Sequence, residues 1–332
     1  MPERDAPDPY FDAFTGLVAA RALMTAVLLG VFDALHERPA TALELADRLR
    51  LDRWGADALL TALTAMGYLR FDGAVIRNAP VSTELLVRSS PHSIADFVGG
   101  LGDLHWQILA PLPTAVRDGQ VYAMHERRRG DGERWESYIR GLYEIYRNDQ
   151  DANAALVPVD DARRLVEVAG AHAGFSIAMC RRHPRLTASV VDLPPSAAVG
   201  RRIVAEQGYA ERVTFREGDV FDVGLGDPAD VVSVFNLVHH LSEERDRELC
   251  RMARASLRPG GFLVIGDSAL PEPGERVSEQ AAISSLLFYA WSHGRNFRPS
   301  EIQRWMVDAG FSEIVVHRNA RSPWRAVVIG RA

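Results

Sequence analysis

The C-terminal half of the chain alternates short runs rich in Val, Ile and Leu with longer stretches of helical character, and this pattern restricts the possible folds more than any other feature. The runs are seven strand candidates, at residues 164–169, 187–193, 212–219, 230–237, 261–267, 312–318 and 325–331. Helix-length segments separate the first five, as in the βαβ units of a parallel sheet. Only residues 319–324 separate the last two, which is too short for a crossover helix. The pattern therefore predicts an α/β fold with a seven-stranded sheet whose last strand runs antiparallel to its neighbour.

The N-terminal third is predicted to be a separate, mostly helical module. Apolar residues recur at helical spacing over 10–37 on more than one side, so we expect this helix to be buried against more than its own domain, as in a dimer. Thr41 and Glu44 form a capping box that opens a second helix, a third helix ends at Gly67, and a hairpin is expected to turn at residues 72–73. Two helices followed by a hairpin predict a winged-helix-like dimerisation domain.

DNA binding is the alternative interpretation of that module. The helix over 59–66 carries no basic residue where a recognition helix needs one, and the net charge of the chain is −6. A winged-helix regulator that senses a ligand is therefore the least favoured function. We assign the dimerisation domain to residues 1–95, linker helices that line a substrate pocket to 96–155, and the sheet domain to 156–332. The charged run 126–134 is predicted to be a solvated loop.

The composition excludes several chemistries. The 332 residues include no lysine, so all 38 basic residues are arginine, and neither Schiff-base nor P-loop lysine chemistry is available. Cys180 and Cys250 lie in apolar helical stretches and are expected to be buried free thiols. The N-terminus has no apolar signal-peptide core, and the longest apolar run, 22–32, is shorter than the ~20 residues that cross a bilayer. We therefore expect a core helix there, a cytoplasmic protein, and neither a membrane nor a nucleic-acid partner.

Acidic residues stand near the carboxyl ends of the first three predicted strands. Glu167 precedes a loop of small residues at 169–174, Asp192 ends the second strand, and Asp219 follows the third. Because parallel strands end at one edge of a sheet, these acids are expected to lie together where ligands bind. Small residues in the loop let the backbone approach a cofactor closely before it enters a helix.

Together these elements resemble the class I S-adenosylmethionine-dependent methyltransferases. The loop after the first strand resembles their glycine-rich loop, with alanine at the alternating positions; 217–221 resembles their Gly-Asp-Phe-Phe element, and 257–261 their Leu-x-Pro-Gly-Gly turn. The N-terminal module, the aromatic linker helices and Val-Val-Asp-Leu-Pro at 190–194 are similar to the small-molecule O-methyltransferases of the caffeate, acetylserotonin and bacterial polyketide type. The resemblance covers essentially the whole chain. It implies a Rossmann-like fold, a homodimer, S-adenosyl-L-methionine as cofactor and S-adenosyl-L-homocysteine as product.

The resemblance also implies the site residues. His239, after the fourth strand, matches the family's general base, and Asp267, which ends the fifth strand, matches the acid that orients it. The implied cofactor residues are Glu167, Ala169, Gly170, Ala171, Asp192, Leu193, Asp219, Val220, Phe221, Phe235 and Asn236. The candidate substrate residues are Trp106, Tyr138, Tyr143, His240, Tyr289 and Asn296, and no metal site is expected. Asn296 stands where plant relatives often carry a second glutamate, which leaves the orientation of the base to Asp267 alone.

The implied function is methyl transfer to a hydroxyl of an aromatic or polyketide-type small molecule in antibiotic biosynthesis. Three alanines in the cofactor loop leave an alternative open. Ala171 and Ala173 are expected to narrow the methionine subsite, whereas Ala169, at the end of a strand, is expected to have a mild effect. The alternative is a methyltransferase-fold enzyme that has lost methyl transfer and catalyses hydroxylation, decarboxylation or a pericyclic cyclisation instead.

Overall fold

A computed structural model describes residues 7–73, 75–123, 132–319 and 322–332 of the chain. Residues 126–131 of the predicted charged loop lie outside these ranges, and 132–134 already belong to a helix. The chain forms two compact units. The first unit comprises Met1–Leu104 and Arg140–Ile145, and the second comprises His105–Ile139 and Tyr146–Ala332. The predicted boundaries at residues 95 and 155 stay predictions.

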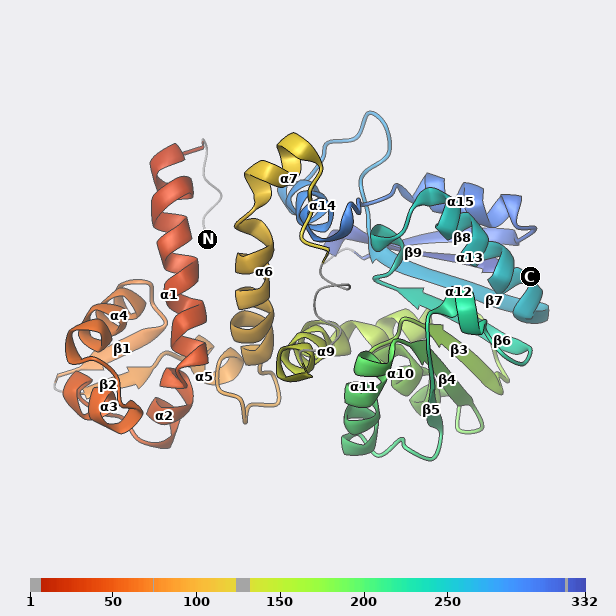
Figure 1. Cartoon of the computed structure of the whole chain (residues 1–332). Helices are drawn as coiled ribbons and strands as arrows, with labels where there is room; N and C mark the ends of the chain where they lie inside the picture. The colour runs from red at the N-terminus through yellow and green to blue at the C-terminus, as the bar shows by residue number, and fades with distance from the viewer. Residues whose placement is uncertain (1–6, 74, 124–131, 320–321) are drawn as a thin grey trace. The chain divides into compact units, whose positions relative to one another are not determined.

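The first unit consists of helices and one two-stranded hairpin (Figure 1). Its elements are η1 (Phe11–Thr15), α1 (Gly16–Leu28), α2 (Val31–Glu37), α3 (Ala42–Leu49), α4 (Arg53–Ala65), β1 (Leu69–Asp72), β2 (Val75–Asn78), α5 (Pro80–Leu85) and η2 (Phe97–Leu101). The capping box is present, because the Thr41 side chain accepts from the Glu44 N–H and the Glu44 carboxylate accepts from the Thr41 N–H. The strands β1 and β2 pair antiparallel, as the predicted hairpin requires.

The single long helix predicted over 10–37 is broken. Gly30 has φ 74° and separates α1 from α2, and glycine reaches this left-handed conformation without a steric penalty. The break allows α2 to place Val31, Phe32 and Leu35 in the apolar core of the unit.

The apolar helix before the break is only lightly buried in its own unit. Phe11–Leu28 has a mean hydropathy of 1.5 and is 11% buried, so by length and composition alone it is also apolar enough to span a membrane. The run 22–32, predicted to be a core helix, is buried at Ala26, Val27, Val31 and Phe32 and exposed at Leu28 and Leu29. Phe14, Leu17 and Val18 are more than half exposed. This apolar stripe is left for a partner to cover.

The second unit is built on a seven-stranded sheet with strand order β5-β4-β3-β6-β7-β9-β8. The strands are β3 (Arg164–Val168), β4 (Thr187–Asp192), β5 (Val213–Glu217), β6 (Ala229–Phe235), β7 (Leu257–Ser268), β8 (Ser312–Asn319) and β9 (Ser322–Arg331). Strands β3 to β7 pair parallel, whereas β9 lies between β7 and β8 and is antiparallel to both. The predicted α/β fold with an antiparallel last strand is therefore confirmed. The turn expected at 257–261 is instead the first part of β7.

Helices cover both faces of this sheet (Figure 1). The helices of the second unit are α7 (Leu112–Asp118), α10 (Gly174–Arg182), α11 (Pro194–Glu206), α12 (Val220–Val223), η3 (Val238–His240), α13 (Glu243–Ser256), α14 (Glu279–Ser292) and α15 (Pro299–Asp308), while α6 (Gly102–Leu109) and α9 (Gly132–Ala155) contribute to both units. One apolar cluster joins α10 to the sheet, and a second joins α13 and α15 to the other face. Cys180 and Cys250 are buried free thiols, as predicted.

Candidate active site

The parallel strands bring the predicted polar residues to one edge of the sheet. Glu167 lies in β3, Asp192 ends β4, Asn236 directly follows β6, and Asp267 is the penultimate residue of β7. Strands β4, β3, β6 and β7 are consecutive neighbours in the sheet and run parallel, so these positions share its carboxyl edge. That edge is where open α/β sheets bind ligands.

The loop after β3 holds three alanines in the left-handed conformation. Ala169, Ala171 and Ala173 have φ angles of 51°, 39° and 57°. An L-residue with a side chain is disfavoured there because its Cβ approaches the following carbonyl oxygen. The expectation that Ala169 would be mild is therefore wrong, because the chain leaves β3 in the left-handed region at this residue.

Hydrogen bonds hold this strained loop in place. The Ala169 N–H donates to the Val191 carbonyl at 2.8 Å, and the Ala173 N–H donates to the Gly170 carbonyl at 2.7 Å. Gly170 itself has no room for a side chain, since a Cβ there would lie 2.6 Å from the Glu167 Cδ. The loop therefore lies directly against Glu167 and Val190 at this residue.

Two buried acids support the loop. The Glu167 carboxylate is 2% exposed and accepts from both the backbone N–H and the hydroxyl of Ser176. Asp192 accepts from the N–H groups of Ala171 and Leu193, each at 2.7 Å. Burial raises the pKa of Glu167 to about 7 and that of Asp192 to about 6, because water no longer stabilises the charged forms.

The predicted cofactor residues Asp219, Val220 and Phe221, from the segment that resembles the Gly-Asp-Phe-Phe element, follow β5. Asp219 is exposed and caps α12 by accepting from the Phe221 N–H at 3.0 Å. The Arg245 guanidinium lies 4.4 Å from the centre of the Phe221 ring. Val220 is 8% exposed and packs in the core instead.

The two predicted residues at the end of β6 and directly after it differ in their surroundings. Phe235 is 6% exposed, and its ring packs on Phe175 with centroids 4.7 Å apart, so this side chain belongs to the core. Asn236 has φ 53°, and its side-chain oxygen accepts from Arg325 Nη2 at 2.9 Å. The Arg325 guanidinium also lies 4.5 Å from the centre of the Tyr146 ring. Sequence reasoning missed Arg325, which lies on β9 and far along the chain from Asn236.

His239 and Asp267 form a buried pair. His239 Nδ1 lies 2.6 Å from Asp267 Oδ1, and the side chains are 4% and 1% exposed. The Ser268 N–H also donates to Asp267 Oδ1 at 2.6 Å, which holds the carboxylate. The imidazole stacks on Phe288 with centroids 3.6 Å apart and an interplanar angle of 16°. A carboxylate against Nδ1 favours the tautomer that leaves Nε2 able to accept a proton.

An aromatic cluster in the second unit includes two of the candidate substrate residues. The Trp291 ring lies 5.7 Å from Tyr138, 5.6 Å from His240 and 5.5 Å from His105, measured between centroids. Burial raises the pKa of Tyr138 and lowers that of His105 to about 4. His240 Nδ1 lies 2.8 Å from the Ser292 hydroxyl. Trp291 and His105 were not predicted, because only the fold brings α6, α9 and α14 together here.

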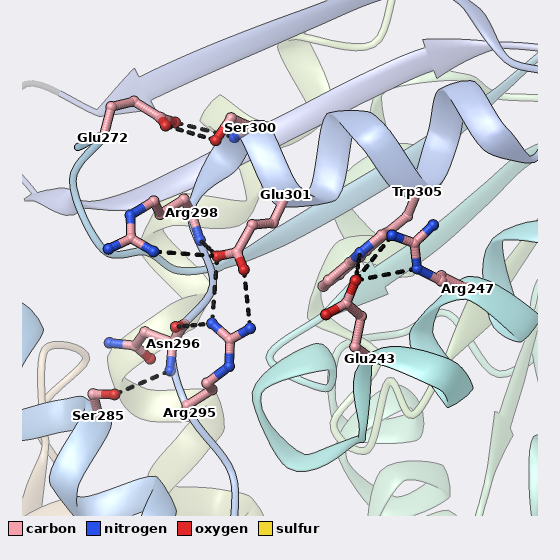
Figure 2. Close-up of polar contacts among 10 residues, drawn as sticks. All are labelled: Glu243, Arg247, Glu272, Ser285, Arg295, Asn296, Arg298, Ser300, Glu301 and Trp305. Atoms are coloured by element: carbon pink, nitrogen blue, oxygen red, sulfur yellow. Dashed lines mark hydrogen bonds and ion pairs between the residues drawn. The ribbon is translucent and has the colours of Figure 1, made fainter.

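The remaining candidate substrate residues differ in burial and in hydrogen bonding. Trp106 is 37% exposed, and the Tyr289 hydroxyl donates to the Ala115 carbonyl at 2.8 Å. Tyr143 belongs to the first unit and the other candidates to the second. Asn296 is fully buried, and its amide donates to the Ala281 carbonyl and to the Ser284 hydroxyl, so these donors bind α14. Figure 2 shows the Asn296 backbone N–H bound to Ser285 of the same helix. Among the described residues no cluster of three or more His, Cys, Asp or Glu could hold a metal.

Two family matches cover most of the chain. Residues 118–312 match the O-methyltransferase domain, and residues 11–88 match the O-methyltransferase dimerisation domain. The chain is 30% identical over 337 residues to the 3-hydroxy-5-methyl-1-naphthoate 3-O-methyltransferase of Streptomyces sahachiroi, across 99% of this chain and 96% of that protein. It is also 30% identical to the N,N-dimethyltransferase OxyT of Streptomyces rimosus, across 75% of this chain and 74% of that protein.

Solved structures agree on the fold. Human N-acetylserotonin methyltransferase in complex with SAM superposes with a TM-score of 0.86 and 19% identity, over 99% of both chains. These findings confirm the resemblance drawn from the motifs. The chain therefore belongs to the family of S-adenosylmethionine-dependent O-methyltransferases, with that family's dimerisation domain in its N-terminal part.

Proposed function

We propose that this protein methylates a hydroxyl of an aromatic or polyketide-type small molecule in antibiotic biosynthesis, with His239 as the general base and Asp267 orienting it. The observation that carries the proposal is the buried contact of 2.6 Å between His239 Nδ1 and Asp267 Oδ1. The Streptomyces sahachiroi relative, which matches nearly the whole chain, is named for methylating a hydroxyl of a naphthoate.

The edge of the sheet fits a bound S-adenosylmethionine. The loop after β3 is built of small residues, Ala169, Gly170, Ala171, Ala173 and Gly174 among them, which let a cofactor approach its backbone. Asp192 and Glu167 lie behind it, and Asp219 is exposed at the neighbouring strand end. When bound, the cofactor supplies an electrophilic methyl group on its sulfonium. We infer that Asp192 and Asp219 bind its ribose and adenine.

The role of the pair follows from acid–base chemistry. A free phenol ionises near pH ~10, so at neutral pH its oxygen is a poor nucleophile unless a base accepts its proton. In the proposed step the proton moves from the substrate hydroxyl to Nε2 of His239. Asp267 then stabilises the resulting imidazolium through Nδ1–H, and Phe288, stacked on the ring, restricts its rotation.

Two alternatives have support of their own. The OxyT relative is named for methylation at nitrogen, so an amine acceptor is the nearest alternative substrate class. The three left-handed alanines support a second alternative, an enzyme that binds the cofactor but does not transfer its methyl group.

We also propose that the protein is a homodimer joined through its N-terminal module, which matches the dimerisation domain and exposes an apolar helix.

Replacing His239 tests the catalytic proposal. S-adenosylhomocysteine is first titrated by calorimetry, and transfer of a labelled methyl group to hydroxynaphthoates and aryl amines is then measured. His239→Ala is expected to lower kcat by about 10²- to 10⁴-fold while cofactor affinity is kept, because only proton transfer is lost. His92→Ala, an exposed histidine of the first unit, is the matched control. Full turnover by His239→Ala would refute the assignment, and cofactor binding without transfer to any acceptor would favour the enzyme that has lost methylation.

A further inference from the structure

A pocket of about 350 Å³ lies in the second unit, between the end of α9 and the strands β6 to β9. Gly266 of β7 lines it, whereas the next residue, Asp267, points to the other face of the sheet, because successive side chains of a strand alternate. The buried neighbours agree, since Val264 belongs to the apolar cluster with α10 and Ile265 to the cluster with α13 and α15. The pocket is therefore separate from the contact between His239 and Asp267.

The floor of the pocket is a row of residues paired across four neighbouring strands. Phe235 of β6 is opposite Gly266 of β7, and Gly266 is opposite Val327 of β9. Val327 is in turn opposite His317 of β8. Residues that are paired across strands point to the same side of a sheet. The side chains of Phe235, Val327 and His317 therefore border one surface.

Most of this surface is apolar. A Cβ at Gly266 would lie 2.2 Å from Phe235 Cε1, so the absence of a side chain there gives the Phe235 ring its space. Phe235 and Val327 are 6% and 9% exposed. Ala152 of α9 and Leu156, which directly follows that helix, also line the pocket. The interior can therefore hold the hydrocarbon part of a small molecule.

Two arginines line the same pocket. Arg325 binds the neutral side chain of Asn236 and lies over the Tyr146 ring, and it has no carboxylate partner among the described residues. Arg318 lies 3.5 Å from the carboxylate of Glu275, and these side chains are 36% and 55% exposed. Ion pairs that are exposed in this way contribute little. The positive charge of Arg325 in particular is left for a ligand to neutralise.

The other polar side chains of the pocket are fewer. The His317 imidazole is half-buried and makes no hydrogen bond to a described residue, so its polar atoms are free to bind a ligand. Asp149 is the one acid among the described residues of the lining. Two arginines against one aspartate leave one positive charge, which favours a ligand with a single negative charge.

We propose that this pocket is a binding site for a small organic monocarboxylate, whose carboxylate meets Arg325 and His317 and whose apolar ring covers Phe235 and Val327. A guanidinium presents paired N–H donors that match a carboxylate. The apolar floor favours an organic acid over inorganic phosphate, and the volume is in the range of small-molecule pockets. This site is additional to the substrate and cofactor sites of the proposed function.

The test begins with calorimetric titration of 1-naphthoate into the full-length protein saturated with S-adenosylhomocysteine. The protein is expected to bind 1-naphthoate, and to bind 1-naphthamide, which has a similar shape and no charge, at least 10-fold more weakly because the charge-assisted hydrogen bonds are lost. Equal affinity for the two probes, or no binding of 1-naphthoate, would overturn the proposal. The measurement needs no methyl transfer, so its result is independent of the proposed function.

Two variants locate the bound probe. Ala152→Trp, at an exposed position of α9 that lines the pocket, should fill part of it and weaken binding of 1-naphthoate by about 10-fold or more. Ala155→Trp, exposed on the same helix and outside the lining, is the matched control and should bind as the wild type does. Arg318→Gln should weaken binding about 3- to 5-fold without changing the thermal midpoint, because it breaks only an exposed ion pair. Unchanged affinity in Ala152→Trp and Arg318→Gln would place the probe elsewhere and refute the assignment.

Discussion

Single residues carry the strain of the cofactor loop. Three alanines occupy left-handed backbone, and the N–H group of each donates a hydrogen bond to a neighbouring residue. The Asp192 carboxylate holds the Ala171 N–H, and Gly200 on α11 leaves the Ala171 carbonyl its space, since a Cβ there would lie 2.2 Å from that oxygen. The loop is thus a strained segment fixed by its surroundings, as is common at ligand sites.

Glycine in this loop should relieve that strain. Ala169→Gly and Ala171→Gly are each expected to raise the free energy of unfolding by about 1 kcal/mol, and Ala173→Gly by less because its buried methyl packs in the core. Urea denaturation measures the change. Ala205→Gly, at an exposed helical position of α11, is the control and should lower stability by about 0.5–1 kcal/mol. Destabilisation by all four substitutions would contradict the assignment of strain.

At the scale of helices and strands, a side chain of β9 links the end of β6 to α9. Arg325 on β9 holds the side chain of Asn236 and lies over Tyr146 of α9, so one side chain joins three elements at the carboxyl edge. Asn236 is itself left-handed and its N–H donates to the Gly266 carbonyl at 2.9 Å. The conformation of the chain after β6 therefore depends on β9. This strand comes last in the sequence but pairs with β7 in the sheet.

Removing this link should weaken cofactor binding. Arg325→Met is expected to raise the Kd for S-adenosylhomocysteine about 5-fold, which corresponds to about 1 kcal/mol for a lost hydrogen bond to a charged donor. Calorimetry provides the measurement. Arg331→Met, at the other end of β9, breaks only an exposed ion pair with Glu313 and should leave the Kd unchanged. An equal effect of both variants would mean that β9 is generally destabilised.

At the scale of the whole molecule, the N-terminal module leaves apolar surface for a second chain. Phe14, Leu17 and Val18 lie on one helix and are 58%, 51% and 53% exposed. A contiguous apolar stripe of this kind usually marks an interface. The match to a dimerisation domain over residues 11–88 includes the whole stripe.

Charge on this stripe should separate the subunits. The double variant Leu17→Asp, Val18→Asp is expected to shift the mass in light scattering from dimer to monomer, because two carboxylates would be desolvated at the interface. Val307→Asp on α15, an exposed apolar residue of the second unit, should leave the mass unchanged. A dimer that persists with both charges in place would exclude α1 from the interface.

Local patterns in the chain predicted much of the fold. Strand runs of six to eight residues, helix-length gaps and one short final gap were enough to predict the seven-stranded sheet with its antiparallel last strand. The contact between His239 and Asp267 was implied by the family resemblance, and it fits the parallel pairing of β6 with β7, because His239 follows β6 and Asp267 lies at the end of β7. Periodicity did not reveal the break at Gly30, since a single left-handed residue leaves the apolar spacing intact.

The sequence by itself determined the fold class through the spacing of its strands and helices, which is a local property, and it determined the family through its motifs. The pairing of His239 with Asp267 was implied by the family resemblance. Only the tertiary structure decided which side chains meet across distant segments. Arg325 reaches Asn236 because the order of strands inserts β9 next to β7. The carboxyl group of Asp246 is buried with no hydrogen-bond partner among the described residues, because α13 packs the face that carries this residue on the sheet. The strain at Ala169 was likewise set by the turn from β3 into α10. Burial and backbone conformation depend on everything that packs against a residue, and no window of sequence contains that information.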